Sequence, residues 1–180
     1  MRLTALPLAG LLLAAALALP ATAQPRLESG GASVGLTDIT PHLEAQFPWQ
    51  REVMPGIASV ALARPVLRLP DDRAELAVDI AVTTLGSTTS LGRATLSSGL
   101  RLDGSTAALY LDAPRMVGFT QPDGQPLVLE PSMASLIDEV LAGYARSQPV
   151  YRLPAEMAPM ANRVEAVQVR DGRLHVRFKR

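Results

Sequence analysis

Apolar and polar residues alternate along the middle of the chain. The alternation occupies four successive runs, at residues 58–69, 75–85, 91–102 and 106–119. In the second run, Leu76, Val78 and Ile80 share one parity, and Glu75 and Asp79 share the other. A period of two predicts β-strands that bury one face and expose the other. Because only short segments connect the runs, we predict an antiparallel meander that is covered on one side.

Three of these runs carry local signals about the predicted sheet. In the first, the alternation changes phase at Arg64 and Pro65, which indicates a β-bulge or an edge position. The hydroxyl-rich segment 86–92 joins the second run to the third, and we interpret it as a hairpin connection rather than a phosphate-binding loop. In the fourth run, one parity collects the apolar residues Leu109, Leu111, Val117 and Phe119.

A strongly periodic segment follows the four runs. Pro131 suits the first turn of a helix, and apolar residues then recur at intervals of three and four. These residues are Met133, Leu136, Ile137, Val140, Leu141 and Tyr144. The pattern predicts an amphipathic helix over 131–147, about 25 Å long, whose apolar face covers the sheet. Most such faces are simply part of the protein core.

Shorter elements are predicted near both ends of the chain. Residues 36–47 contain an apolar residue every four positions, which predicts a short helix capped by Thr37 or Thr40 with Pro41 in its first turn. Near the C-terminus, Asp171 and Gly172 predict a two-residue hairpin turn. One face of that hairpin would carry Val167, Val169, Leu174, Val176 and Phe178. About six strands that do not alternate with helices indicate an α+β fold.

The N-terminal segment reads as a secretory signal peptide. Arg2 precedes an apolar run too short to span a bilayer comfortably, and residues 21–23 form a small-x-small cleavage site. A retained anchor is the alternative. We therefore expect a signal peptide at 1–23, a flexible leader at 24–35 and a single domain at 36–180.

Composition excludes several classes of function. The chain has 17 basic and 17 acidic residues, without the clustered basic excess of a nucleic-acid binder. The absence of cysteine excludes disulfides, thiolate chemistry and the lipobox cysteine of a lipoprotein. His42 and His175 have no metal-ligand partners at the usual spacing, and no nucleophile motif occurs. We therefore expect no catalytic residues, no metal and no cofactor, and we predict a non-enzymatic protein.

Several charged residues fall on the predicted polar face of the strands. These are the arginines Arg93, Arg101, Arg173 and Arg177. They could form one patch that attracts anionic headgroups, although ordinary solvated charges are the simpler interpretation.

The order of elements resembles that of the YceB-like family of small periplasmic proteins of unknown function, which are usually lipoproteins. The most specific pieces of the resemblance are "LTDITPHLEAQFP" at 36–48 and "SQPVYRL" at 147–153. That family is similar to the tubular lipid-binding (TULIP) superfamily, in which a curved antiparallel sheet wraps a long helix and a lipid chain can lie between them. The chain departs from the family by lacking the lipobox cysteine and by placing Pro41 in the first helix.

The resemblance implies a curved antiparallel sheet of about six strands, a meander plus the C-terminal hairpin, wrapped around helix 131–147. It places a hydrophobic ligand between the helical residues Met133, Leu136, Ile137, Val140, Leu141 and Tyr144 and the strand residues Val78, Ile80, Leu96 and Leu100. We therefore expect a soluble periplasmic protein that binds a lipid or another hydrophobic ligand, with no nucleic-acid partner and no transmembrane span after signal cleavage. The alternative is a structural or interaction module with a filled core, which docks a cell-envelope protein or acts as an envelope chaperone.

Overall fold

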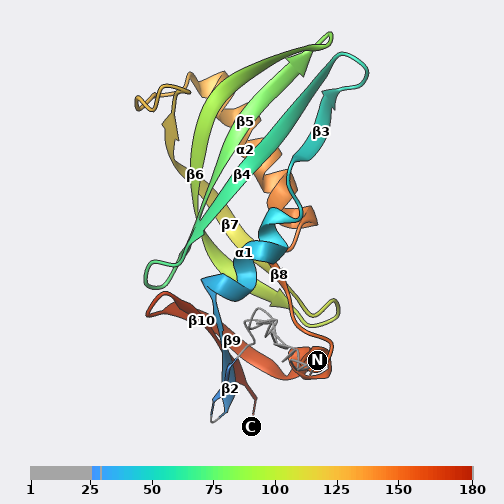
Figure 1. Cartoon of the computed structure of the whole chain (residues 1–180), viewed down its shortest axis with the longest axis vertical. Coiled ribbons are helices and arrows are strands. Elements are labelled where there is room, and N and C mark those ends of the chain that lie inside the picture. The colour runs from blue at the N-terminus through green and yellow to red at the C-terminus, as the bar shows by residue number, and fades with distance from the viewer. Residues whose placement is uncertain (1–25, 29, 180) are drawn as a thin grey trace, which may run out of the picture.

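A computed structural model describes residues 26–28 and 30–179 of the protein. These residues form two antiparallel sheets, two α-helices and a 3-10 helix, so the fold is α+β as predicted (Figure 1). The predicted signal peptide, residues 1–23, lies outside the described residues. Within the described part of the chain, no helix has both the length and the apolar character needed to cross a bilayer.

The larger sheet has six strands in chain order, each antiparallel to its neighbours. They are β3 (Trp49–Met54), β4 (Ala58–Arg68), β5 (Ala74–Thr84), β6 (Ser87–Asp103), β7 (Ala108–Thr120) and β8 (Tyr151–Arg152). Strands β4 to β7 are the four alternating runs, and their meander is confirmed. Strands β3 and β8 were not predicted, because a short edge strand carries too few residues for alternation to stand out.

Local signals within the meander have mixed outcomes. The register of β4 against β5 shifts between Ala63 and Val66, so the predicted bulge is confirmed. The hairpin predicted at 86–92 exists, but its turn is only Leu85 and Gly86, which both have positive φ as a tight hairpin requires. Residues 87–92 of the predicted connection belong to strand β6. The prediction for Val117 was wrong: this side chain is exposed, because the register of β6 against β7 shifts beside it.

The smaller sheet corrects two expectations. Its four strands, in spatial order, are β1 (Arg26–Glu28), β2 (Gly31–Gly35), β10 (Arg173–Phe178) and β9 (Val164–Arg170). The C-terminal hairpin turns at Asp171 and Gly172 as predicted, but it pairs with β2 and not with the meander. Within the segment expected to be a flexible leader, residues 31–35 instead form the buried strand β2. The polar and glycine-rich composition concealed a strand that only its distant partner specifies.

The first helix, α1 (Leu36–Glu44), connects the two sheets. Its N-cap is Gly35, whose backbone N–H donates to the carboxylate of Asp38 over 2.8 Å, so the predicted threonine caps were wrong. Pro41 lies inside the helix and not in its first turn. Because proline has no N–H to donate to a carbonyl of the preceding turn, the interior position costs one helical hydrogen bond.

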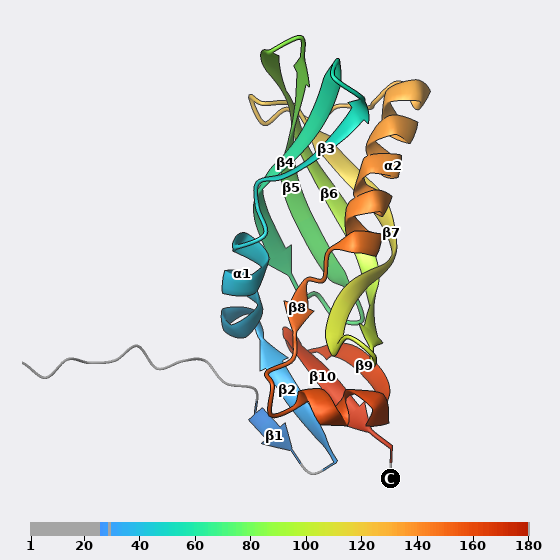
Figure 2. The same cartoon turned by 90° about the vertical axis from the view of Figure 1, so that its right-hand side faces the viewer.

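The second helix, α2 (Pro131–Ser147), starts at Pro131 as predicted and lies along one face of the larger sheet (Figure 2). The 3-10 helix η1 (Ala158–Arg163) leads from β8 into β9. The molecule is elongated, with the smaller sheet at one end (Figure 1). The β3–β4 turn, the β5–β6 turn and the N-terminus of α2 lie at the other end. The core lies between the larger sheet and both helices and continues into the smaller sheet at Val34, Val169 and Leu174.

Candidate functional site

The six helical residues of the predicted ligand site fall into two groups, one buried and one partly exposed. Four of its residues are buried in the core: Ile137, Val140, Leu141 and Tyr144. Met133 and Leu136, in contrast, are each 38% exposed. Ala145, which is buried, was missed because alanine adds little to an apolar pattern. The C-terminal half of α2 therefore packs as core, and its N-terminal half keeps part of the apolar stripe accessible.

The strand half of the predicted site belongs to the core. Val78, Ile80 and Leu96 are buried, and Leu100 is half-buried and packs against the same core cluster. A gap of about 10 Å³ lies between helix and sheet. It is lined by Val60, Ile80, Val82, Leu91, Met133, Leu136, Ile137 and Val140. A volume of this size holds at most about one water molecule, so an acyl chain enters it only if side chains move.

A larger apolar pocket of about 510 Å³ lies next to this gap and is open to solvent. Its lining comes from β6, β7, the loop before α2 and the first turns of α2: Leu91, Phe119, Leu127, Val128, Leu129, Glu130, Ser132, Met133 and Ile137. The pocket and the closed gap share Leu91, Met133 and Ile137. The gap is therefore the inner continuation of the open pocket.

Sequence reasoning missed most of this pocket. The run 127–129 is apolar, but it lies in a loop between two predicted elements and follows no period. The available signal was its composition, because three consecutive apolar residues in a loop are unusual unless they pack or bind. Val128 is 96% exposed, so at this position the run does not pack.

At the other end of the stripe, Tyr144 is enclosed by aromatic rings. Its ring centroid lies 5.3 Å from that of Phe47 and 5.5 Å from that of Trp49. Within the described part of the chain, no group hydrogen-bonds to its hydroxyl. Burial raises the pKa of the Tyr144 hydroxyl far above its usual value, because the phenolate would lose its hydration. The buried hydroxyl is therefore neutral at physiological pH.

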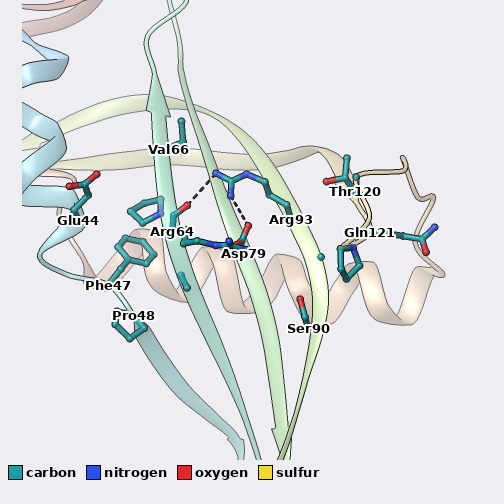
Figure 3. Close-up of a pocket in the computed structure, with 15 residues that line it drawn as sticks. Glu44, Phe47, Pro48, Arg64, Val66, Asp79, Ser90, Arg93, Thr120 and Gln121 are labelled. Atoms are coloured by element: carbon teal, nitrogen blue, oxygen red, sulfur yellow. Dashed lines mark hydrogen bonds and ion pairs between the residues drawn. The ribbon is translucent and has the colours of Figure 1, made fainter.

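A second hollow lies across strands β4 to β6 and has a volume of about 830 Å³ (Figure 3). Asp79 stands near its centre, on the parity opposite to Ile80 and hence on the face turned away from the core. Arg93 Nη1 donates to Asp79 Oδ1 over 2.6 Å, and Arg64 forms an ion pair with Oδ2. Arg93 also donates to the backbone carbonyl of Arg64 over 3.2 Å. This network ties the β4 bulge to β5 and β6.

The chemistry of this hollow favours a structural role. Both oxygens of Asp79 accept from guanidinium groups, so the carboxylate is occupied. The four charged residues of the lining, Glu44, Arg64, Asp79 and Arg93, balance in sign. A hollow without net charge gives no electrostatic preference to an anion. Among the described residues, no group of three or more metal-ligating side chains could hold a metal ion.

The four arginines considered as one anion-attracting patch do not come together. Arg93 takes part in the network of the larger sheet, and Arg101 lies 5.4 Å above the ring of Tyr110. Arg173 and Arg177 belong to β10 in the smaller sheet, where Arg177 forms an ion pair with Glu165 over 3.2 Å. The idea of a single patch was wrong because it assumed one sheet.

Comparison of the chain with models of known protein families and with curated protein sequences gives no match. The open apolar pocket beside α2 is thus identified as the candidate site from its geometry alone.

Proposed function

We propose that this protein is a non-enzymatic, exported binding protein for a lipid or another hydrophobic ligand. The observation that carries the proposal is the open apolar pocket of about 510 Å³ between the N-terminal half of α2, the preceding loop and the sheet. Its volume lies within the range of about 300–1,000 Å³ that is usual for small-molecule sites. Seven of its nine lining residues are apolar, which suits a hydrocarbon chain.

The ligand would lie with its chain against Leu91, Phe119 and Ile137 and its end directed at the closed gap. Met133 lines both the open pocket and the gap, and its unbranched side chain changes shape at low cost. A chain that displaces Met133 could extend between helix and sheet, where the TULIP-like resemblance places a ligand. In this arrangement the sheet would curve around α2, as that resemblance also implies. The signal peptide expected at 1–23 would direct the protein to the periplasm.

Uptake of a fluorescent fatty acid tests the proposal. The protein beginning at Gln24 contains every described strand and helix, and it omits the apolar N-terminal segment. We expect saturable uptake by this protein, and copurifying lipid in native mass spectra. Met133→Asp should weaken uptake about tenfold or more, because it places a charge against the chain. Ser135→Asp adds the same charge to an exposed helical position outside the lining and should leave uptake unchanged.

Two results would contradict the proposal. The first is repeated absence of both copurifying lipid and fatty-acid uptake. The second is equal uptake by the Met133→Asp and wild-type proteins, because a ligand in this pocket must contact that residue.

A second candidate function is a structural or interaction module that docks a cell-envelope protein or acts as an envelope chaperone. The observation that favours it is the small size of the helix–sheet gap, about 10 Å³, together with the exposure of Val128. A pull-down from periplasm that depends on Val128, by a protein that takes up no fatty acid, would favour this function over lipid binding.

A further inference from the structure

Two neighbouring hairpin turns at one end of the larger sheet expose large apolar side chains. The β3–β4 turn carries Met54 and Ile57, which are 52% and 51% exposed, and the β5–β6 turn carries Leu85, which is 82% exposed. The turns are adjacent, because the backbone N–H of Leu85 donates to the carbonyl of Ile57 over 3.0 Å. We call residues 54–57 and 84–87 the uncharged tip. The N-terminus of α2, beside the open pocket, lies at the same end of the molecule (Figures 1 and 2).

Charge is absent from a long stretch of chain around each turn of the uncharged tip. No charged residue stands between Glu52 and Arg64, or between Asp79 and Arg93. The turns at the opposite end of the same strands are different. The β4–β5 turn contains two aspartates and an arginine, and the β6–β7 connection follows directly on an aspartate at the end of β6. The same sheet therefore has charged turns at one end and two uncharged, apolar turns at the other, with Glu52 as the carboxylate beside them.

Two backbone hydrogen bonds lie within the uncharged tip, and a pair of side-chain hydroxyls is bonded next to it. Besides the bond between the two turns, the N–H of Ile57 donates to the carbonyl of Met54 over 3.0 Å. The hydroxyls of Thr83 and Thr88 share a hydrogen bond of 2.8 Å across the β5–β6 hairpin. Groups that are paired internally lose less when water is replaced by a medium of low polarity. The tip is therefore suited to enter such a medium.

We propose that the uncharged tip docks on a phospholipid bilayer, with Met54, Ile57 and Leu85 inserted into its interface. Apolar side chains that project from narrow turns fit a deformable layer into which each can sink separately. The nearest charge along β3 is the carboxylate of Glu52, which lines a small hollow with Ile57 and Leu85, so the tip has no cationic group that would require anionic lipid. The proposal rests on the lipid-binding function, because docking at this end would bring the mouth of the apolar pocket close to its source of lipid.

Flotation with vesicles of pure phosphatidylcholine tests the proposal, with the protein beginning at Gln24. We expect the wild-type protein to float with the vesicles, equally at about 0.05 M and about 0.5 M salt, since uncharged contacts are not screened. The double variant Ile57→Ser with Leu85→Ser should bind at least about tenfold more weakly, because binding to the interface scales with buried apolar area. Val66→Ser is the matched control, since Val66 is an exposed apolar residue in the hollow of Figure 3 and should not affect flotation.

A fluorescent reporter gives a second, direct readout. With vesicles, the added indole of Leu85→Trp should emit at shorter wavelength and be quenched by brominated lipid, whereas that of Val66→Trp should not respond. Failure of the wild-type protein to float, or equal flotation of the double variant, would overturn the proposal. Binding of the tip to a purified protein but not to vesicles would overturn it in favour of a protein partner.

Failure of docking and failure of lipid binding are distinguishable. The double variant of the tip should take up fluorescent fatty acid from solution as the wild type does, because neither substituted residue lines the open pocket. Flotation without any uptake would leave a membrane-docking protein and refute the ligand pocket. Uptake without flotation would leave the pocket and refute the docking tip.

Discussion

Replacing Tyr144 by phenylalanine should make the protein more stable. The Tyr144 side chain has 0% exposure, and none of the described residues hydrogen-bonds to its hydroxyl. A buried hydroxyl without a partner costs about 1–3 kcal/mol. Removing the oxygen leaves a space of about 10–15 Å³, which at about 24 cal/mol per Å³ costs about 0.3 kcal/mol. The free energy of unfolding should therefore rise by about 1 kcal/mol, and Tm by about 2–4 °C for a domain of this size.

Urea unfolding, followed by far-UV circular dichroism and by the fluorescence of Trp49, measures this change. Trp49 is the only tryptophan, and its ring centroid lies 5.5 Å from that of Tyr144. Tyr144→Ala is the contrasting variant: it removes the ring as well as the hydroxyl, and should lower the free energy of unfolding by about 3–5 kcal/mol. The two substitutions at one site should therefore have opposite signs.

Alkaline pH gives an independent readout of the same hydroxyl. Burial raises the pKa of Tyr144 in the folded protein, so above about pH 10 the phenol ionises more readily in the unfolded chain. Ionisation of the unfolded chain does not lower the free energy of unfolding below about pH 10, but lowers it progressively as the pH rises further. The Tyr144→Phe variant has no such group at this position, so its free energy of unfolding should fall less over the same pH range. If Tyr144→Phe instead lowers stability by about 1 kcal/mol or more, the reasoning is refuted, because the hydroxyl must then have a hydrogen-bond partner in solution.

Three further predictions concern packing, charge and backbone geometry. Leu141→Ala should lower the free energy of unfolding by about 2–5 kcal/mol, and Leu136→Ala, at a partly exposed position of the same helix, by less than about 1 kcal/mol. Equal losses in urea unfolding would contradict the assigned packing of α2. Asp79→Asn should cost about 1–2 kcal/mol, because the amide offers two guanidinium groups a single acceptor oxygen and no negative charge. Arg64→Ala should cost less than about 0.5 kcal/mol because Arg64 is exposed, and the reverse order in thermal unfolding would contradict the network. Gly92→Ala should lower the free energy of unfolding by about 2–4 kcal/mol, since Gly92 has a φ of +137° and a Cβ would collide with the β7 backbone. An unchanged Tm would show that β6 has a different local path.

Sequence patterns located the main secondary structure of this protein. The four alternating runs, the helix at Pro131–Ser147 and the turn at Asp171 and Gly172 all occur where they were predicted. These features depend on a local cause: strands and helices repeat with periods of two and 3.6, and only certain residues adopt positive φ. Strand β2 had no such signal, because its burial depends on pairing with β10, about 140 positions further along the chain.

The candidate site was determined less by sequence and more by tertiary structure. The apolar stripe of α2 identified residues that meet the sheet, and Ile137, Val140, Leu141 and Tyr144 are buried. The stripe could not indicate where packing ends, because periodicity describes one helix and not the elements placed around it. The open pocket combines side chains from β6, β7, a loop and α2, and the uncharged tip combines two turns about 30 positions apart. Composition and periodicity alone fixed the α+β class, but only the three-dimensional contacts decided that there are two sheets, that one end of the larger sheet is apolar, and that a pocket lies beside it.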